Sequence, residues 1–361
     1  MEAAPSAIAE RAHAELERHG VPGAAFGVLR DGRTDAFAAG VRNVETSGAI
    51  GLQTPFRIAS ITKPFVATLA LELVRAGKVS LDDPVGYGVT LRQALSHTGG
   101  VAIEWPRPLD PYGDDDDALF RLVADEPGRL PVGPGELFSY SNAGYWLAGA
   151  ALARACATTF ERALEQRVLE PLGLARTGFE PLAEAAVGHE ADPGSREHRP
   201  SRAEYPRVRR SSGGLWSTAE DLLSFAEASF ARPELHEAVA GSAARGYGLG
   251  WSLRDAGGRP AGSEDLQPRC RRRRMAGGDA RDHSAARGTT TPPTRASPGR
   301  GNSTRSCAQA PSTSSNARGP TRRARASGNS SRSSVNGSVS AIATASASPT
   351  NRTRAFSRLS R

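Results

Sequence analysis

Residues 56–65 read FRIASITKPF, and they place Ser60 three residues before Lys63 at the start of an apolar, helix-forming run. Side chains three residues apart share one face of a helix. A buried lysine amine can accept a proton from a neighbouring hydroxyl, whereas an arginine guanidinium stays protonated. Only two of the 46 basic residues are lysines, Lys63 and Lys78. The stretch therefore indicates an activated serine, although the spacing alone also fits a capping serine beside a surface lysine.

Charge and apolar residues divide the chain near residue 261. Residues 262–361 hold 19 arginines against four acidic residues, a net charge of +15, and few large apolar side chains. Residues 1–261 hold 27 basic against 34 acidic residues, a net charge of −7, and enough apolar residues for a core. We expect a folded domain over 1–261 and a low-complexity, disordered Arg/Ser-rich tail over 262–361. Because the positive charge belongs to the tail, the folded part is not expected to bind nucleic acid.

Composition also excludes several classes of site. The three cysteines, Cys156, Cys270 and Cys307, have no metal-binding or disulfide spacing, and we expect Cys156 to lie in a helical core. No metal and no cofactor is indicated. The N-terminus lacks the apolar segment of a signal peptide, and no run is long enough to cross a membrane. The sequence thus predicts a cytoplasmic protein without a membrane partner, whose partner is a small molecule.

Hydrophobic periodicity predicts a mixed α/β (α+β) fold. An Asp31-Gly32 turn signal joins two strand-like runs, and Thr90 is placed to cap a helix. A capping-box pattern at Ser217-Thr218-Ala219-Glu220 begins another helix. We expect helices over residues 5–19, 60–76, 91–97, 118–124, 141–156, 159–171 and from about 218 to 233, and strands over residues 24–30, 33–42 and 247–253.

Two further motifs carry chemistry-bearing side chains. Tyr140 and Asn142 flank Ser141 just where a helix begins; a tyrosine near a lysine can act as a base, and an asparagine offers both a donor and an acceptor. Taken alone, Tyr140 fits a half-buried core aromatic equally well. His97 stands in Ser96-His97-Thr98-Gly99-Gly100, where we expect it to close a helix rather than to serve as a triad base.

Taken together, the motifs resemble those of the serine hydrolases that include class C β-lactamases, DD-peptidases and related esterases. The resemblance runs from about Val21 to Leu253. It implies an antiparallel sheet flanked by helices, with an all-α subdomain. It also implies a role for each site residue: Ser60 as the acylated nucleophile, Lys63 as its activator, Tyr140 as general base and Asn142 as a substrate-binding residue. The motifs that carry it are VPG at 21–23, TPFR at 54–57, SxxK at 60–63, LSHTGG at 95–100, YSN at 140–142, GGLWST at 213–218 and YGLGW at 247–251.

One element of that family is missing from the sequence. The family carries Lys-Thr-Gly or His-x-Gly on a later strand, which supplies the second oxyanion N–H beside that of Ser60. This chain has no lysine after Lys78, and His283 is not followed by that glycine. We therefore expect the sheet to be truncated at its C-terminal strands. Losing one oxyanion donor costs about 10²–10³ in rate, and missing strands would leave a sheet edge and an apolar face exposed. The chain as written is therefore expected to be inactive or poorly soluble.

Three hypotheses remain for function. The first is a serine hydrolase acting through an acyl-enzyme on an ester, amide or β-lactam-type substrate. The second is a non-catalytic binding or interaction protein that keeps the same pocket. The third, nucleic-acid binding by the tail, is disfavoured because the tail has no fold and no interleaved aromatics. An out-of-frame translation of GC-rich coding DNA would explain the tail's composition. Translating the other two frames tests that idea.

Overall fold

The computed structural model of the chain describes residues 7–30, 32–191, 197–201, 205–242, 245–255, 260–262 and 338–344. All of these lie in one compact unit, formed by residues 1–268 and 334–361. Its helices are α1 (Ala7–His19), α2 (Thr62–Arg75), α3 (Leu91–Leu95), α4 (Ala118–Leu122), α5 (Asn142–Cys156), α6 (Phe160–Leu164), α7 (Arg210–Gly213) and α8 (Ala219–Phe230).

The strands form small antiparallel sheets. One sheet has the order β13-β1-β2 and another the order β12-β11-β10-β9, and three pairs join β3 to β8, β4 to β5 and β6 to β7. Their bounds are β1 (Gly23–Arg30), β2 (Arg33–Gly40), β3 (Phe56–Arg57), β4 (Pro84–Gly86), β5 (Val89–Thr90), β6 (His189–Glu190), β7 (Arg199–Pro200), β8 (Trp216–Ser217), β9 (Ala240–Ser242), β10 (Arg245–Tyr247), β11 (Ser252–Asp255), β12 (Pro260–Gly262) and β13 (Ser338–Thr344).

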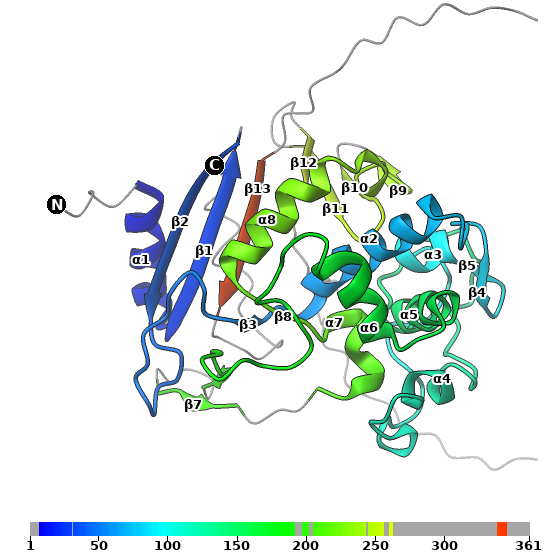
Figure 1. Cartoon of the computed structure of the whole chain (residues 1–361), viewed down its shortest axis with the longest axis horizontal. Coiled ribbons are helices and arrows are strands. Elements are labelled where there is room, and N and C mark those ends of the chain that lie inside the picture. Colours follow the sequence, from blue (N-terminus) through cyan, green and yellow to red (C-terminus); the bar gives the residue numbers. More distant parts are fainter. Residues whose placement is uncertain are drawn as a thin grey trace, which may run out of the picture. The chain divides into compact units, whose positions relative to one another are not determined.

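The strands β1 and β2 form the expected hairpin, in which Phe26 pairs with Phe37. Helix α1 packs against β2, and α8 packs against β1 (Figure 1). The approach of α8 depends on Gly27, because a Cβ there would lie 2.6 Å from Cδ1 of Leu223. The missing side chain thus lets the helix lie close to the sheet.

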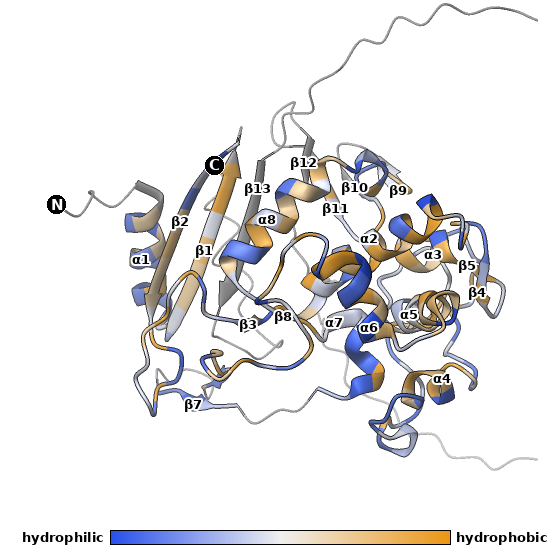
Figure 2. Cartoon of the chain, viewed as in Figure 1, coloured by the Kyte–Doolittle hydropathy of each residue, from blue (hydrophilic) through white to orange (hydrophobic). Residues whose placement is uncertain are grey.

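The helical part surrounds α2 and α5. Phe65, Leu69 and Leu73 of α2 are fully buried at helical spacing, and so are Tyr145 and Trp146 of α5. Figure 2 shows α5 coloured for apolar residues along most of its length. A helix that is apolar all round belongs in the interior of a domain. The buried residues of α2 and α5 belong to one core cluster, which holds the start of α2 in place.

The structure confirms most of the expected elements and corrects two. Residues 247–253 are not one strand but the turn of the β10–β11 hairpin, because the Gly248 N–H donates to the Trp251 carbonyl at 2.9 Å and Gly250 takes φ +79°. The cap of α8 is not Ser217 but Thr218, whose hydroxyl accepts from the Asp221 N–H. The preceding residue, Ser217, instead extends β8.

The C-terminal region also departs from expectation at one place. The sequence predicts no strand within 262–361, yet β13 pairs antiparallel with β1 over seven residues. An alternation of Ser with Val, Ala and Ile in this segment fits a strand. The rest of the predicted tail, with Cys270, His283 and Cys307, lies outside the described residues. The division at residue 261 therefore stays a prediction.

Candidate active site

Ser60 stands at the junction of a short turn and a long helix. The turn is the 3₁₀ segment Ala59–Ile61, which leads directly into α2. Ala59 has φ +46°, a left-handed conformation that is costly for a residue with a Cβ. The Thr62 hydroxyl stabilises this turn, because it donates to the Ala59 carbonyl at 2.7 Å and accepts from the Leu215 N–H at 3.1 Å. Ser60 is thereby held half-buried at the N-terminal end of α2.

Lys63 is fully buried, and its ammonium group donates to three oxygens. They are Ser60 Oγ at 3.0 Å, Asn142 Oδ1 at 2.9 Å and the Ser212 carbonyl at 2.6 Å. An ammonium group has three N–H donors, so each has an acceptor here. A charged group is retained in the interior only with such compensation. The arrangement fixes Nζ beside the serine hydroxyl.

Tyr140 contacts both Ser60 and Lys63. Its hydroxyl lies 2.7 Å from Ser60 Oγ, and its ring lies 4.8 Å from Lys63 Nζ. A second ring, that of Tyr145, lies 5.2 Å from the same Nζ. Complete burial, and then the nearby Tyr140, raise the pKa of Tyr145 well above its usual value, so Tyr145 stays a neutral phenol. Its hydroxyl donates to the Leu95 carbonyl, so Tyr140 is the tyrosine placed to exchange a proton with Ser60.

Ser141 holds Tyr140 and Asn142 in register. Its hydroxyl caps α5 by accepting from the Gly144 N–H at 2.9 Å, and it donates to the Ala102 carbonyl at 2.7 Å. Asn142 is the first residue of α5, and its side chain points Oδ1 at Lys63. The structure thus brings Ser60, Lys63, Tyr140 and Asn142 together, although almost 80 residues separate the two motifs.

His97 is a structural neighbour of this cluster. It takes φ +60° just past α3, and its Nδ1 accepts the backbone N–H of Ser141 at 3.0 Å. Its ring packs 4.4 Å from the Tyr140 ring. Burial, together with the Lys63 charge, places the pKa of His97 well below its usual value. The imidazole is therefore neutral and engaged with the backbone, as expected for a histidine that closes a helix.

Two further residues, Ser212 and Glu104, contact the cluster, and a third, Arg209, contacts Glu104; none was anticipated from the sequence. Ser212 supplies the carbonyl that accepts from Lys63, and its hydroxyl accepts from Trp146 Nε1 at 2.8 Å. Glu104 accepts from Asn142 Nδ2 at 2.6 Å and from Arg209 at 3.0 Å. Of these residues, the sequence could have pointed only to Ser212, because it directly precedes the Gly213-Gly214 motif.

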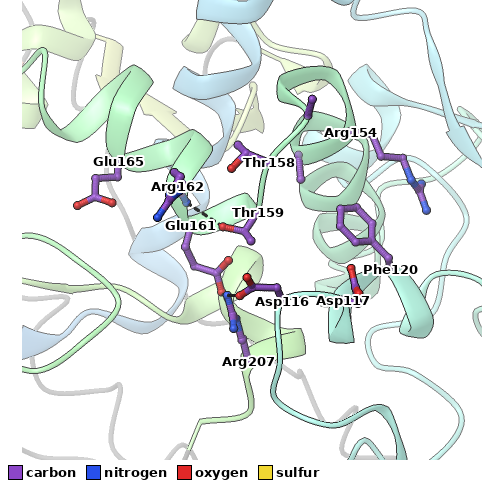
Figure 3. A pocket seen from close by; sticks show the side chains of 12 residues that line it. Asp116, Asp117, Phe120, Arg154, Thr158, Thr159, Glu161, Arg162, Glu165 and Arg207 are labelled. Atoms are coloured by element: carbon purple, nitrogen blue, oxygen red, sulfur yellow. Dashed lines mark hydrogen bonds and ion pairs between the residues drawn. The ribbon is translucent and has the colours of Figure 1, made fainter.

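A cavity of about 780 Å³ lies between α4, α5 and α6, and none of the four site residues lines it. Arg207 extends between Asp116 and Glu161 at its lower wall, and Arg154 lies over Phe120 on the other side (Figure 3). Arg207 is thus already paired with two carboxylates, and the described residues of the lining contain no hydroxyl beside an amine like that at Ser60. Catalytic chemistry is therefore better placed at Ser60 than here.

Within the described ranges, no helix is long and apolar enough to cross a membrane. The same ranges contain no cluster of three or more histidine, cysteine or acidic side chains suited to a metal ion. The site consists of hydroxyl, amine, amide and backbone groups. Such groups can activate a nucleophile and move a proton without a bound ion.

The Beta-lactamase family model matches residues 8–302. The chain belongs to this family. Its members are serine hydrolases of the β-lactamase and DD-peptidase type, and the fold is theirs. Penicillin-binding protein 4 of Amycolatopsis lactamdurans is 30% identical over 299 residues, which cover 71% of this chain and 77% of that protein. A Beta-lactamase of Yersinia enterocolitica is 25% identical and covers 66% of each chain.

Solved structures show the same fold. A class C β-lactamase superposes with a TM-score of 0.60 at 20% identity, covering 69% of this chain and 74% of that one. The present chain thus spans between two thirds and about three quarters of these relatives. At this level of identity the superposition establishes the fold alone.

Proposed function

We propose that this chain is a serine hydrolase in which Ser60 forms an acyl-enzyme with an ester, amide or β-lactam-type substrate. The observation that carries the proposal is the position of Ser60 Oγ, which lies 3.0 Å from Lys63 Nζ and 2.7 Å from Tyr140 Oη. Both distances are within the range for direct proton transfer. A structural serine rarely has two such groups converging on its hydroxyl.

The reaction follows from these contacts. Ser60 Oγ attacks the substrate carbonyl carbon while its proton passes to the Tyr140–Lys63 pair, which titrates as a unit because both groups contact the serine. With Lys63 as an ammonium group the acceptor is the Tyr140 phenolate, and after a proton shift within the pair it is the neutral amine of Lys63. The same pair returns a proton to the leaving group, and the acyl group remains on Ser60 as an ester. Water then hydrolyses this ester by the reverse proton route. Asn142 contacts the substrate's amide or acyl oxygen through its side-chain N–H.

The negative charge that develops on the substrate oxygen needs donors. The Ser60 N–H, at the start of α2, provides one of them, and the helix dipole adds to it. The expected second donor belongs to the motif that the sequence lacks. Because one missing donor costs about 10²–10³ in rate, acylation of Ser60 is a better readout than turnover.

The relatives support the substrate class. The names of the two curated relatives refer to penicillin binding and to β-lactam hydrolysis. Both involve attack of a nucleophile on an activated amide carbonyl. Within that class we favour a small ester or amide, because the sequence predicts a cytoplasmic location away from cell-wall peptides.

Covalent labelling tests the proposal. The purified full chain is incubated with a fluorophosphonate and, separately, with a penicillin, and the adduct is located by intact-mass and peptide mass spectrometry. We expect one adduct on Ser60 that disappears in Ser60→Ala. Labelling that persists in this variant, or a folded chain that neither probe labels, would overturn the proposal.

The missing motif favours a second candidate, a binding protein that keeps the pocket without the chemistry. Such a protein would bind a penicillin reversibly and form no adduct. Equilibrium dialysis of the Ser60→Ala variant separates the two, since a binding protein retains its affinity and an acyl-transfer site loses the covalent complex.

A further inference from the structure

Two charged residues outside the sequence motifs, Glu104 and Arg209, extend the hydrogen bonding of the Asn142 amide. Glu104 Oε1 accepts from Asn142 Nδ2 at 2.6 Å, and the same oxygen accepts from Arg209 at 3.0 Å. On its other side, Asn142 Oδ1 accepts from Lys63 at 2.9 Å. The four side chains form a continuous chain of hydrogen bonds that ends at Ser60.

The chemistry of the two neighbours fixes the orientation of the amide. A carboxylate only accepts hydrogen bonds, and an ammonium group only donates them. Asn142 therefore has one favourable orientation, with Nδ2 toward Glu104 and Oδ1 toward Lys63. With a neutral partner in place of Glu104, only Lys63 would select this orientation, and Nδ2 would lose its charged acceptor.

Glu104 is itself held in place. Its chain segment is attached to the start of α5, because the Asn142 backbone N–H donates to the Ile103 carbonyl at 2.8 Å. The guanidinium of Arg209 lies 5.8 Å from the Trp146 ring and 5.5 Å from the Tyr205 ring. Stacking on aromatic faces restricts an arginine and orients its donors.

The contacts distinguish this pair from an ordinary surface ion pair. The side chains of Glu104 and Arg209 are 41% and 32% exposed, so their attraction adds little stability by itself. The hydrogen bond that Glu104 accepts from Asn142, in contrast, connects it to the fully buried Lys63. A role in orienting Asn142 explains a contact that a surface pair would not make.

We propose that Glu104 is a positioning residue that fixes the Asn142 amide for substrate binding, and that Arg209 holds Glu104 in place. This rests on the proposed function of the Ser60 site. Glu104 takes one of the two Nδ2 hydrogens, so the other is directed to the substrate's acyl or amide oxygen. This hydrogen bond favours the binding of substrates that carry a carbonyl or amide group next to the scissile bond.

The first test compares two probes in Glu104→Gln. A penicillin carries an amide that Asn142 can contact, whereas a simple alkyl fluorophosphonate carries none. We expect the rate of penicillin acylation to fall about tenfold, the effect of one oriented hydrogen bond, and fluorophosphonate labelling to fall much less. Glu234→Gln is the control, because Glu234 pairs with Arg75 at a similar exposure of 46%. An equal loss with both probes, or none, overturns the proposal.

The second test needs no activity. Asn142→Asp places a second carboxylate against Glu104, and like charges at this distance repel. Adding Glu104→Gln to this variant exchanges the two groups, so that the amide stands at position 104 and the carboxylate at position 142. The amide can then donate to the carboxylate, and the carboxylate faces Lys63. We expect Asn142→Asp to lower the urea midpoint at pH 7.5 and the double variant to recover most of the loss.

The two tests separate failure of the inference from failure of the proposed function. If the effects of the two substitutions on the urea midpoint are simply additive, Glu104 does not act through Asn142 and the inference is wrong. If the double variant recovers the midpoint but no probe labels Ser60, the inference holds for the amide and the proposed acyl transfer is wrong.

Discussion

The backbone of Gly250 lies against the backbone of Lys63, so that a Cβ at Gly250 would stand 2.9 Å from the Lys63 carbonyl oxygen. Gly250 also takes φ +79°, which an L side chain rarely adopts. The turn of the β10–β11 hairpin is thereby in contact with the first turn of α2. The position of Lys63 depends on a residue 187 positions later in the sequence.

We expect Gly250→Ala to destabilise the protein by about 2–4 kcal/mol, the sum of left-handed strain and a backbone clash. Urea unfolding measures this loss. Gly77→Ala is the matched control, because Gly77 has φ +65° but open space around its Cβ position. The control should show the conformational cost alone, about 1 kcal/mol. Equal losses in the two variants would contradict the contact with Lys63.

Lys63→Arg tests the requirement for an amine. Arginine keeps the positive charge but does not release a proton, and its larger head does not fit a fully buried site. We expect the rate of Ser60 labelling by a fluorophosphonate to fall about 10²–10⁴-fold, the range for losing a general base. Lys78→Arg, at the exposed end of the same helical region, should label at the wild-type rate. Wild-type labelling in Lys63→Arg would show that Lys63 has no role in activation.

His97→Leu tests the contact between His97 and the Tyr140 segment. Leucine leaves the Ser141 N–H buried without its acceptor and is strained at φ +60°. An unsatisfied buried donor costs about 1–3 kcal/mol, which urea unfolding would detect. His97→Asn should lose less, because asparagine tolerates this backbone conformation and can offer an oxygen. If the asparagine variant is the less stable of the two, the acceptor role is wrong.

The stability of the folded state should decrease in acid partly through two histidines. Burial lowers the pKa of His236 from 6.5 to about 4, and burial, with the charge of Lys63, places the pKa of His97 well below its usual value. Below pH 6.5 the unfolded chain therefore binds protons that the folded chain does not, and folding becomes less favourable as pH falls. Each histidine contributes a slope of about 1.4 kcal/mol per pH unit at most.

Urea unfolding between pH 7.5 and 4.5 measures this dependence. His236→Phe removes one titrating group while keeping a ring against Trp251, so its stability should fall less steeply than that of the wild type below pH 6.5. His13→Phe, at an exposed position on α1, is the control. Parallel slopes for wild type and His236→Phe would contradict the assignment.

The sequence predicted the elements whose signals are local. The β1–β2 hairpin, the helix after Ser60 and the Thr90 cap follow from periodicity and capping residues, and the structure confirms them. The four site residues were found because their motifs lie at helix starts. Their meeting in space agrees with the resemblance, and their catalytic roles remain proposals.

What the sequence could not predict depends on long-range contacts. The turn at Gly248 and Gly250 resembled a strand because Tyr247, Leu249, Trp251 and Leu253 alternate, while the close approach to α2 that selects glycine is tertiary. Glu104 lies in a loop and Arg209 in a 3₁₀ turn, neither of them within a motif, and only folding brings Glu104 to Asn142 and Arg209 to Glu104. Strand β13 becomes evident only beside β1, since its seven-residue alternation is too short to stand out within the surrounding Ser/Ala-rich sequence.

The double hydrogen bonding of the Ser141 hydroxyl constrains how this site can vary. Because that hydroxyl caps α5 and is tied to Ala102, Tyr140 and Asn142 occupy fixed positions on either side of it. The preceding loop is tied to the same region, because the Gly135 N–H donates to the Thr98 carbonyl at 2.7 Å and the Phe138 ring lies 5.8 Å from the His97 ring. An insertion or deletion between Tyr140 and Asn142 would rotate the asparagine off the helix start and separate it from Lys63. The single-residue spacing between Tyr140 and Asn142 should therefore tolerate no change in length.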